Sequence, residues 1–176
     1  MDWKELEAEV FTATEKALMD LKKAHGDEQF YACVLYTDSS AMTIAFSTNS
    51  EEALKAKLDL EDPLERDELE SYYKWTSSEW EYEAWGGEYF KNPCRLIRES
   101  GERIDISGFK KKIFAIMTSV LGRLRKNEAF QDFKNQNPML FVTVTDDDGA
   151  ENIENETARA LNSSLMYEKF SKRFDG

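Results

Sequence analysis

Three glutamates alternate with large side chains in a short segment of the chain. Glu79, Glu81 and Glu83 are separated by single residues, Trp80 and Tyr82. Neighbouring carboxylates can divide the roles of general acid and general base when their surroundings shift their pKa values apart. The spacing alone does not distinguish them from a solvated face. One interpretation is therefore a hydrolase-like enzyme of unrecognised type, with Glu79 or Glu83 acting in a cleft beside Trp80.

Other catalytic and metal-binding patterns are weak. His25 is the only histidine, and it falls where the first helix should end, a position that favours a cationic side chain. No serine or cysteine lies in a recognisable nucleophile setting, and no glycine-rich phosphate loop is present. The triplet 146–148 lacks EF-hand spacing, because the first and twelfth loop positions would be Val144 and Asn155. We expect no metal or cofactor, and a turn in which Asp148 and Glu151 cap the last helix.

The aromatic segment can instead be a contact surface. It contains three of the four tryptophans, spaced five residues apart. In a helix, steps of five residues rotate by about 140°, so the three rings cannot share one narrow face. At least one ring should be peripheral, and peripheral tryptophans rimmed by acids are typical of protein interfaces. We expect Trp80 to favour the core more than Trp85 does. The candidate partner-binding surface consists of Trp75, Glu79, Trp80, Glu83 and Trp85.

Charge is unevenly distributed along the chain. The net charge is −12, and residues 51–83 hold 12 acids and 4 bases, whereas residues 91–126 hold 10 bases and 3 acids. The two segments can face each other or solvate their own helices. Alternatively, the acidic segment can attract a basic protein, since complementary potential speeds encounter. Nucleic acid is disfavoured by the overall acidity, and would require 110–112 and 123–126 to share one exposed stripe.

The hydrophobic pattern predicts a single α+β domain over residues 1–176, with a small, mainly antiparallel sheet packed by several helices. Strands are predicted at 29–37, 42–48 and 139–146. The first two form a hairpin, and the third is buried on both faces. The main helices are predicted at 2–24, with Asp2 as N-cap, at 109–126 and at 150–173, with a break at 162–164.

Other segments are less regular. A short helix is predicted from Ser50 to Leu58, whereas 59–71 and 91–108 read as loops. Two alternatives compete for 79–84. Alternation would suit an edge strand, but Thr76 and Glu79 have capping-box spacing, which favours a short helix ended by Gly86.

Targeting and redox features are sparse. The chain has no signal-peptide pattern and no apolar run long enough to span a bilayer, so we expect a cytoplasmic protein without a membrane partner. Cys33 and Cys94 are the only cysteines, and buried free thiols are the expectation. The pattern does not define an oligomeric state.

The segment Lys74-Trp75-Thr76-Ser77-Ser78-Glu79-Trp80-Glu81-Tyr82 resembles the bacterial family catalogued as domain of unknown function 4303. The amphipathic first helix and Glu28-Gln29-Phe30-Tyr31-Ala32 extend the likeness over most of the chain. The family form Trp-Ser-Pro-X-Glu-Trp has serine and proline where Thr76 and Ser77 stand here. The family has no established activity, so the resemblance implies no site residues. By analogy with small acidic bacterial proteins, it suggests an immunity-type role against a toxin. The favoured interpretation is a non-enzymatic module that binds a basic, toxin-like protein.

Overall fold

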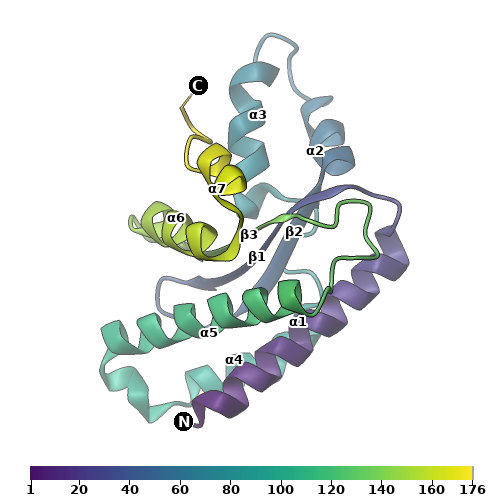
Figure 1. Cartoon of the computed structure of the whole chain (residues 1–176). Helices are drawn as coiled ribbons and strands as arrows, with labels where there is room; N and C mark the ends of the chain where they lie inside the picture. The colour runs from purple at the N-terminus through teal and green to yellow at the C-terminus, as the bar shows by residue number, and fades with distance from the viewer. Residues whose placement is uncertain (176) are drawn as a thin grey trace.

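A three-stranded mixed sheet lies at the centre of the computed structural model, which describes residues 1–175 (Figure 1). The strands are β1 (Phe30–Asp38), β2 (Ala45–Ser50) and β3 (Met139–Thr145), in the order β2-β1-β3. β1 and β2 form the predicted antiparallel hairpin. β3 pairs with β1 in parallel, so one of the two strand pairings is parallel. The sheet is therefore mixed, not mainly antiparallel as predicted. The α+β class is confirmed, and the parallel pairing requires the chain to cross over between β2 and β3.

Both faces of the sheet are buried. Alternate residues such as Cys33 and Leu140 face one hydrophobic cluster, which α1 (Trp3–His25) and α5 (Ile106–Lys126) cover. The intervening residues, such as Val34 and Phe141, face a second cluster. α6 (Ala150–Leu161), α7 (Ser164–Phe170) and α3 (Arg66–Trp75) lie on that side (Figure 1). The predicted burial of the third strand on both faces is confirmed.

Side-chain caps set the starts of two predicted helices, at Asp2 as predicted and at Ser50, which precedes its helix and is not the first residue in it. The Oδ1 atom of Asp2 accepts hydrogen bonds from the backbone N–H groups of Lys4 at 2.9 Å and Glu5 at 3.1 Å. Ser50 Oγ accepts from the N–H of Ala53 at 3.0 Å and begins α2 (Glu51–Leu58). Such caps satisfy N–H groups that the first helical turn leaves without partners. The last cap was predicted wrongly, since Gly149 rather than Asp148 precedes α6 and no side chain caps it.

Two segments predicted as loops contain helices. α3 occupies part of 59–71 and continues to Trp75, yet it has no fully buried residue. The prediction was wrong because Pro63 and the many acids indicated a loop, whereas α3 begins after Pro63 and places Leu69 and Tyr73 one turn apart on its part-buried side. α4 (Lys91–Arg98) begins two residues before Pro93. Proline is tolerated in the first turn, where its missing N–H would have no intrahelical acceptor.

The segment after α3 is extended, so the predicted short helix at 79–84 is wrong. Only the 3₁₀ turn Ser77–Glu79 forms, and Thr76 makes no side-chain cap. From Trp80 the chain runs along the outer edge of β2, where the N–H of Thr48 donates to the carbonyl of Tyr82 at 3.3 Å. Gly86, with φ of 67°, ends the segment in the left-handed region. The edge-strand alternative holds only at Tyr82, where one isolated bridge joins this segment to Thr48; residues 81 and 83–86 form turns.

The outer edge of β3 is closed by side chains instead of by another strand. Asn162 Oδ1 accepts from the N–H of Leu140 at 2.9 Å, and its Nδ2 donates to the carbonyl of the same residue at 2.7 Å. Two residues further along β3, Thr157 Oγ1 accepts from the N–H of Val142 at 2.9 Å. These contacts satisfy backbone groups that an open edge would expose to other strands. α6 and the residue after it thereby fix the position of β3.

We expect Asn162→Ala to lower the free energy of unfolding by about 1–3 kcal/mol, because it leaves part-buried backbone groups of Leu140 without partners. Urea denaturation followed by tryptophan fluorescence measures this loss. Asn152→Ala, which alters an exposed asparagine of α6, is the control and should change stability by less than about 0.5 kcal/mol. Equal losses in the two variants would contradict the role of Asn162 as an edge cap.

Candidate functional site

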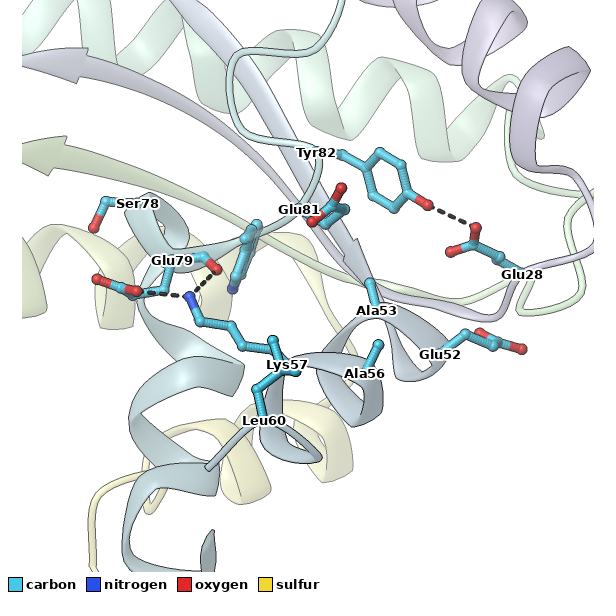
Figure 2. A pocket seen from close by; sticks show the side chains of 11 residues that line it. Glu28, Glu52, Ala53, Ala56, Lys57, Leu60, Ser78, Glu79, Glu81 and Tyr82 are labelled. Atoms are coloured by element: carbon cyan, nitrogen blue, oxygen red, sulfur yellow. Dashed lines mark hydrogen bonds and ion pairs between the residues drawn. The ribbon is translucent and has the colours of Figure 1, made fainter. Parts of the chain in front are cut away.

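An acidic groove lies between α2 and the extended segment that follows α3 (Figure 2). Its volume is about 690 Å³. Four glutamates from three parts of the chain line it, together with a single lysine; they are Glu28, Glu52, Glu79, Glu81 and Lys57. The glutamates come together because β2 leads directly into α2, while the extended segment runs along the β2 edge.

Lys57 neutralises one end of the groove. Its Nζ donates to Glu79 Oε2 and to the Glu79 carbonyl, both at 2.7 Å, as the dashed lines of Figure 2 show. The same ammonium lies 4.4 Å from the ring centroid of Tyr73, a cation–π distance. The hydrogen bond from Lys57 lowers the pKa of Glu79. Glu79 is thus held as a carboxylate, which makes it a poor general acid near neutral pH.

The opposite end of the groove contains a hydrogen-bonded cluster around Glu28. Tyr82 donates its hydroxyl to Glu28 Oε1 at 2.6 Å, and Ser50 donates to Glu28 Oε2. His25 Nδ1 lies 3.1 Å from Glu28 Oε1 and 3.2 Å from the Tyr82 hydroxyl. Burial and the adjacent Glu28 carboxylate raise the pKa of Tyr82. Because Ser50 is fully buried and caps α2, it serves the fold and is not accessible as a nucleophile.

The three candidate tryptophans do not form one surface. Trp80 is only 4% exposed and packs in the second hydrophobic cluster, where its Nε1 donates to the carbonyl of Lys74 at 3.1 Å. Trp75 is half-buried in the same cluster, 5.2 Å from the ring centroid of Phe170. Trp85 packs against the cluster on the other face of the sheet and donates to the carbonyl of Ala17 at 3.1 Å. Trp80 and Trp85 thus each have a backbone partner for the indole N–H.

The two candidate glutamates also have different surroundings. Glu79 lines the groove, whereas Glu83 is exposed and accepts a hydrogen bond from Tyr36 on β1. Sequence reasoning missed Glu28, Glu52 and Lys57 as groove residues. Glu28 stands in the segment that opens β1, but its proximity to Tyr82 depends on the hairpin and was not readable from spacing.

Most of the acidic segment has no basic partner in the structure. Its four bases pair with Asp59, Glu79 and Glu51, and Lys134 reaches Glu52. The other acids of 51–83 have no cationic group within 4 Å among residues 1–175; they are Glu61, Asp62, Glu65, Asp67, Glu68, Glu70, Glu81 and Glu83. A negative surface therefore extends from the groove along α3.

The basic segment, in contrast, makes its ion pairs elsewhere. Lys110 contacts Asp147 at 2.7 Å, Lys112 contacts Glu102 at 2.9 Å, and Arg123 contacts Glu7 at 3.4 Å. None of the ion pairs in the described part of the chain joins 91–126 to 51–83. The two segments therefore do not neutralise each other.

Two structural features bear on metal and membrane binding. Within residues 1–175, no group of three or more histidine, cysteine or acidic side chains is arranged to hold a metal ion. No helix in that range combines the length and apolarity needed to cross a membrane.

Fold and groove together define a small α+β protein with a mixed three-stranded sheet and an acidic groove beside its β2 edge. The family model described as Domain of unknown function (DUF4303) matches residues 10–163, and the chain belongs to this family. The resemblance drawn from the tryptophan segment and the β1 opening is thereby confirmed. No curated protein and no solved structure matches the chain.

Proposed function

We propose that this protein is a cytoplasmic, non-enzymatic binding module that engages a basic protein through the acidic groove and the adjacent face of α3. An immunity-type role, in which the basic partner is a toxin, fits this chemistry. The observation that carries the proposal is the groove itself, where four glutamates face one lysine that is already bound to Glu79. A partner's lysine or arginine side chains would supply the missing positive charge.

The mode of binding follows from the closed sheet edges. Asn162 and Thr157 occupy the β3 edge, and the extended segment covers β2 through the Tyr82 carbonyl. A partner strand would have to displace these contacts before it could extend the sheet. Side-chain recognition in the groove needs no such rearrangement and is the mode we favour.

A hydrolase-like enzyme remains the alternative, because the groove is concave and contains Glu79 beside Trp80, as that interpretation requires. Two observations weigh against it. The pKa of Glu79 is lowered instead of raised, since Lys57 donates to its carboxylate. Glu83, the other candidate acid, lies outside the groove and is exposed. Binding is therefore the better-supported function.

The test is a pull-down with Glu52→Gln/Glu81→Lys, which weakens the groove charge while the new amide oxygen at position 52 can still accept from the N–H of Gln29. We expect wild-type protein to capture a basic protein at about 50 mM salt and to lose it above about 300 mM. The variant should capture at least about tenfold less. Glu156→Gln/Glu15→Lys, with the same charge change on exposed acids outside the groove, is the matched control. Absence of any salt-sensitive partner, or equal loss in both variants, would contradict the proposal.

A further inference from the structure

Two leucines at the tip between α2 and α3 are almost completely exposed. Leu60 is 87% and Leu64 is 89% exposed, and they are separated by three residues. The helices that carry this tip extend away from the sheet at the top of Figure 1. Single exposed leucines are ordinary, but two on one short tip offer apolar surface that association can cover.

The tip is held in place by its own hydrogen bonds. The N–H of Leu60 donates to the carbonyl of Lys57 at 3.1 Å, and the N–H of Leu64 donates to Asp62 Oδ1 at 2.9 Å. Arg66, the first residue of α3, stabilises the loop by donating hydrogen bonds to the carbonyls of Asp59 at 3.2 Å and Glu61 at 3.3 Å. The leucines are therefore presented outward by an ordered turn. Such preorganisation lowers the entropic cost of binding.

The surroundings of the leucines define the chemistry of an occupant. Leu60 also lines the acidic groove, so the tip adjoins the groove through this leucine. Asp62, Glu65 and Asp67 flank the tip in the chain without a cationic group within 4 Å in the described range. A second copy of this chain would bring the same negative charge to the tip, and an anionic membrane would also be repelled. The occupant that fits is apolar and positively charged at once.

We propose that Leu60 and Leu64 dock a basic amphipathic segment of the partner protein, with its apolar side chains on the leucines and its lysine or arginine side chains in the groove. This inference rests on the proposed function and specifies the partner's chemistry. Charge alone would attract any basic protein. The leucines would select a segment that carries its apolar residues on one side and its basic residues on the other.

The probe is a pair of labelled peptides, each about 18 residues long, made of leucine and lysine in the same proportion. One places leucines at helical i, i+3, i+4 spacing, and the other has the order scrambled. In fluorescence anisotropy titrations, we expect wild-type protein to bind the amphipathic peptide at least about tenfold more tightly than the scrambled one. Leu60→Ser/Leu64→Ser should abolish this preference. Leu165→Ser, which alters a leucine of α7 that is 66% exposed, should keep it.

Three outcomes would overturn the inference. If both peptides bind wild-type protein equally and only Glu52→Gln/Glu81→Lys weakens them, the groove recognises charge alone and the proposed function stands without the leucines. If neither the groove variant nor the leucine variant changes binding, the proposed function fails as well. If sedimentation shows a dimer that the leucine variant dissociates, the occupant is a second copy. Circular dichroism of each variant excludes loss of folding as the cause.

Discussion

Replacing Arg173 by alanine should lower the free energy of unfolding by about 3–5 kcal/mol, because it leaves a buried carboxylate without its cation. The Arg173 side chain is 1% exposed, and its Nη2 donates to Glu154 Oε2 at 2.7 Å. Its Nη1 donates to Asn155 Oδ1 at 2.7 Å and to the carbonyl of Phe170 at 3.1 Å. The arginine thus joins the end of the chain to α6. Urea denaturation at neutral pH measures the loss.

The pH dependence separates this mechanism from simple loss of packing. Burial raises the pKa of Glu154 even beside Arg173, and removal of the cation should raise it further. The folded state of Arg173→Ala then binds more protons than the unfolded state, so its stability falls as pH rises through the Glu154 pKa. The deficit should therefore shrink when the measurement is repeated at lower pH.

Lys172→Ala provides the matched control, since Lys172 and its partner Glu168 are both more than 60% exposed. This surface pair should contribute less than about 1 kcal/mol. A loss in Arg173→Ala that equals the control, or that does not depend on pH, would show that Glu154 does not need the buried cation.

The sequence predicted the parts of the fold that carry strong local signals. The two long helices have apolar residues at regular three- and four-residue spacing, and the cap at Asp2 was recognisable because it acts within one turn. α3 was missed because Pro63 and the run of acids around it indicated a loop, although the helix begins only after Pro63. The parallel pairing of β3 with β1 was also unpredictable, since it depends on contacts between residues about a hundred positions apart.

The candidate site was predictable only in part. Glu79 was identified from its own segment, and the acidic run on α3 from composition. The groove also needs Glu28 and Glu52, which the hairpin and α2 bring opposite Glu81. Its one cation, Lys57, is 22 residues from Glu79 in the chain, so neither the pairing nor the lowered pKa of Glu79 could be read from spacing. The local sequence pattern identified the acidic residues, but only the tertiary structure shows which of them line the groove.

Trp80→Ala should lower the free energy of unfolding by about 3–5 kcal/mol, the range for removal of a buried large aromatic side chain. Trp80 is 4% exposed, and its ring centroid lies 6.2 Å from those of both Tyr31 and Phe141. The substitution would open a cavity in the second hydrophobic cluster and remove the hydrogen bond to the Lys74 carbonyl. Thermal or urea unfolding, followed by far-ultraviolet circular dichroism, measures the loss.

Two further variants decide what the Trp80 ring contributes. Trp80→Phe keeps most of the buried ring but loses the N–H donor, so it should cost less, about 1–3 kcal/mol. Tyr72→Ala, which alters a neighbouring ring that is 46% exposed, should change stability by less than about 0.5 kcal/mol. If Trp80 were instead a partner anchor, Trp80→Ala would fold with nearly full stability and lose binding to the basic peptides. We expect instead that Trp80→Ala loses stability and that Trp80→Phe still binds the peptides. This result would assign recognition to the glutamates and the exposed leucines. The Trp80 ring, which is buried and lines the groove, would then stabilise the groove without anchoring the partner.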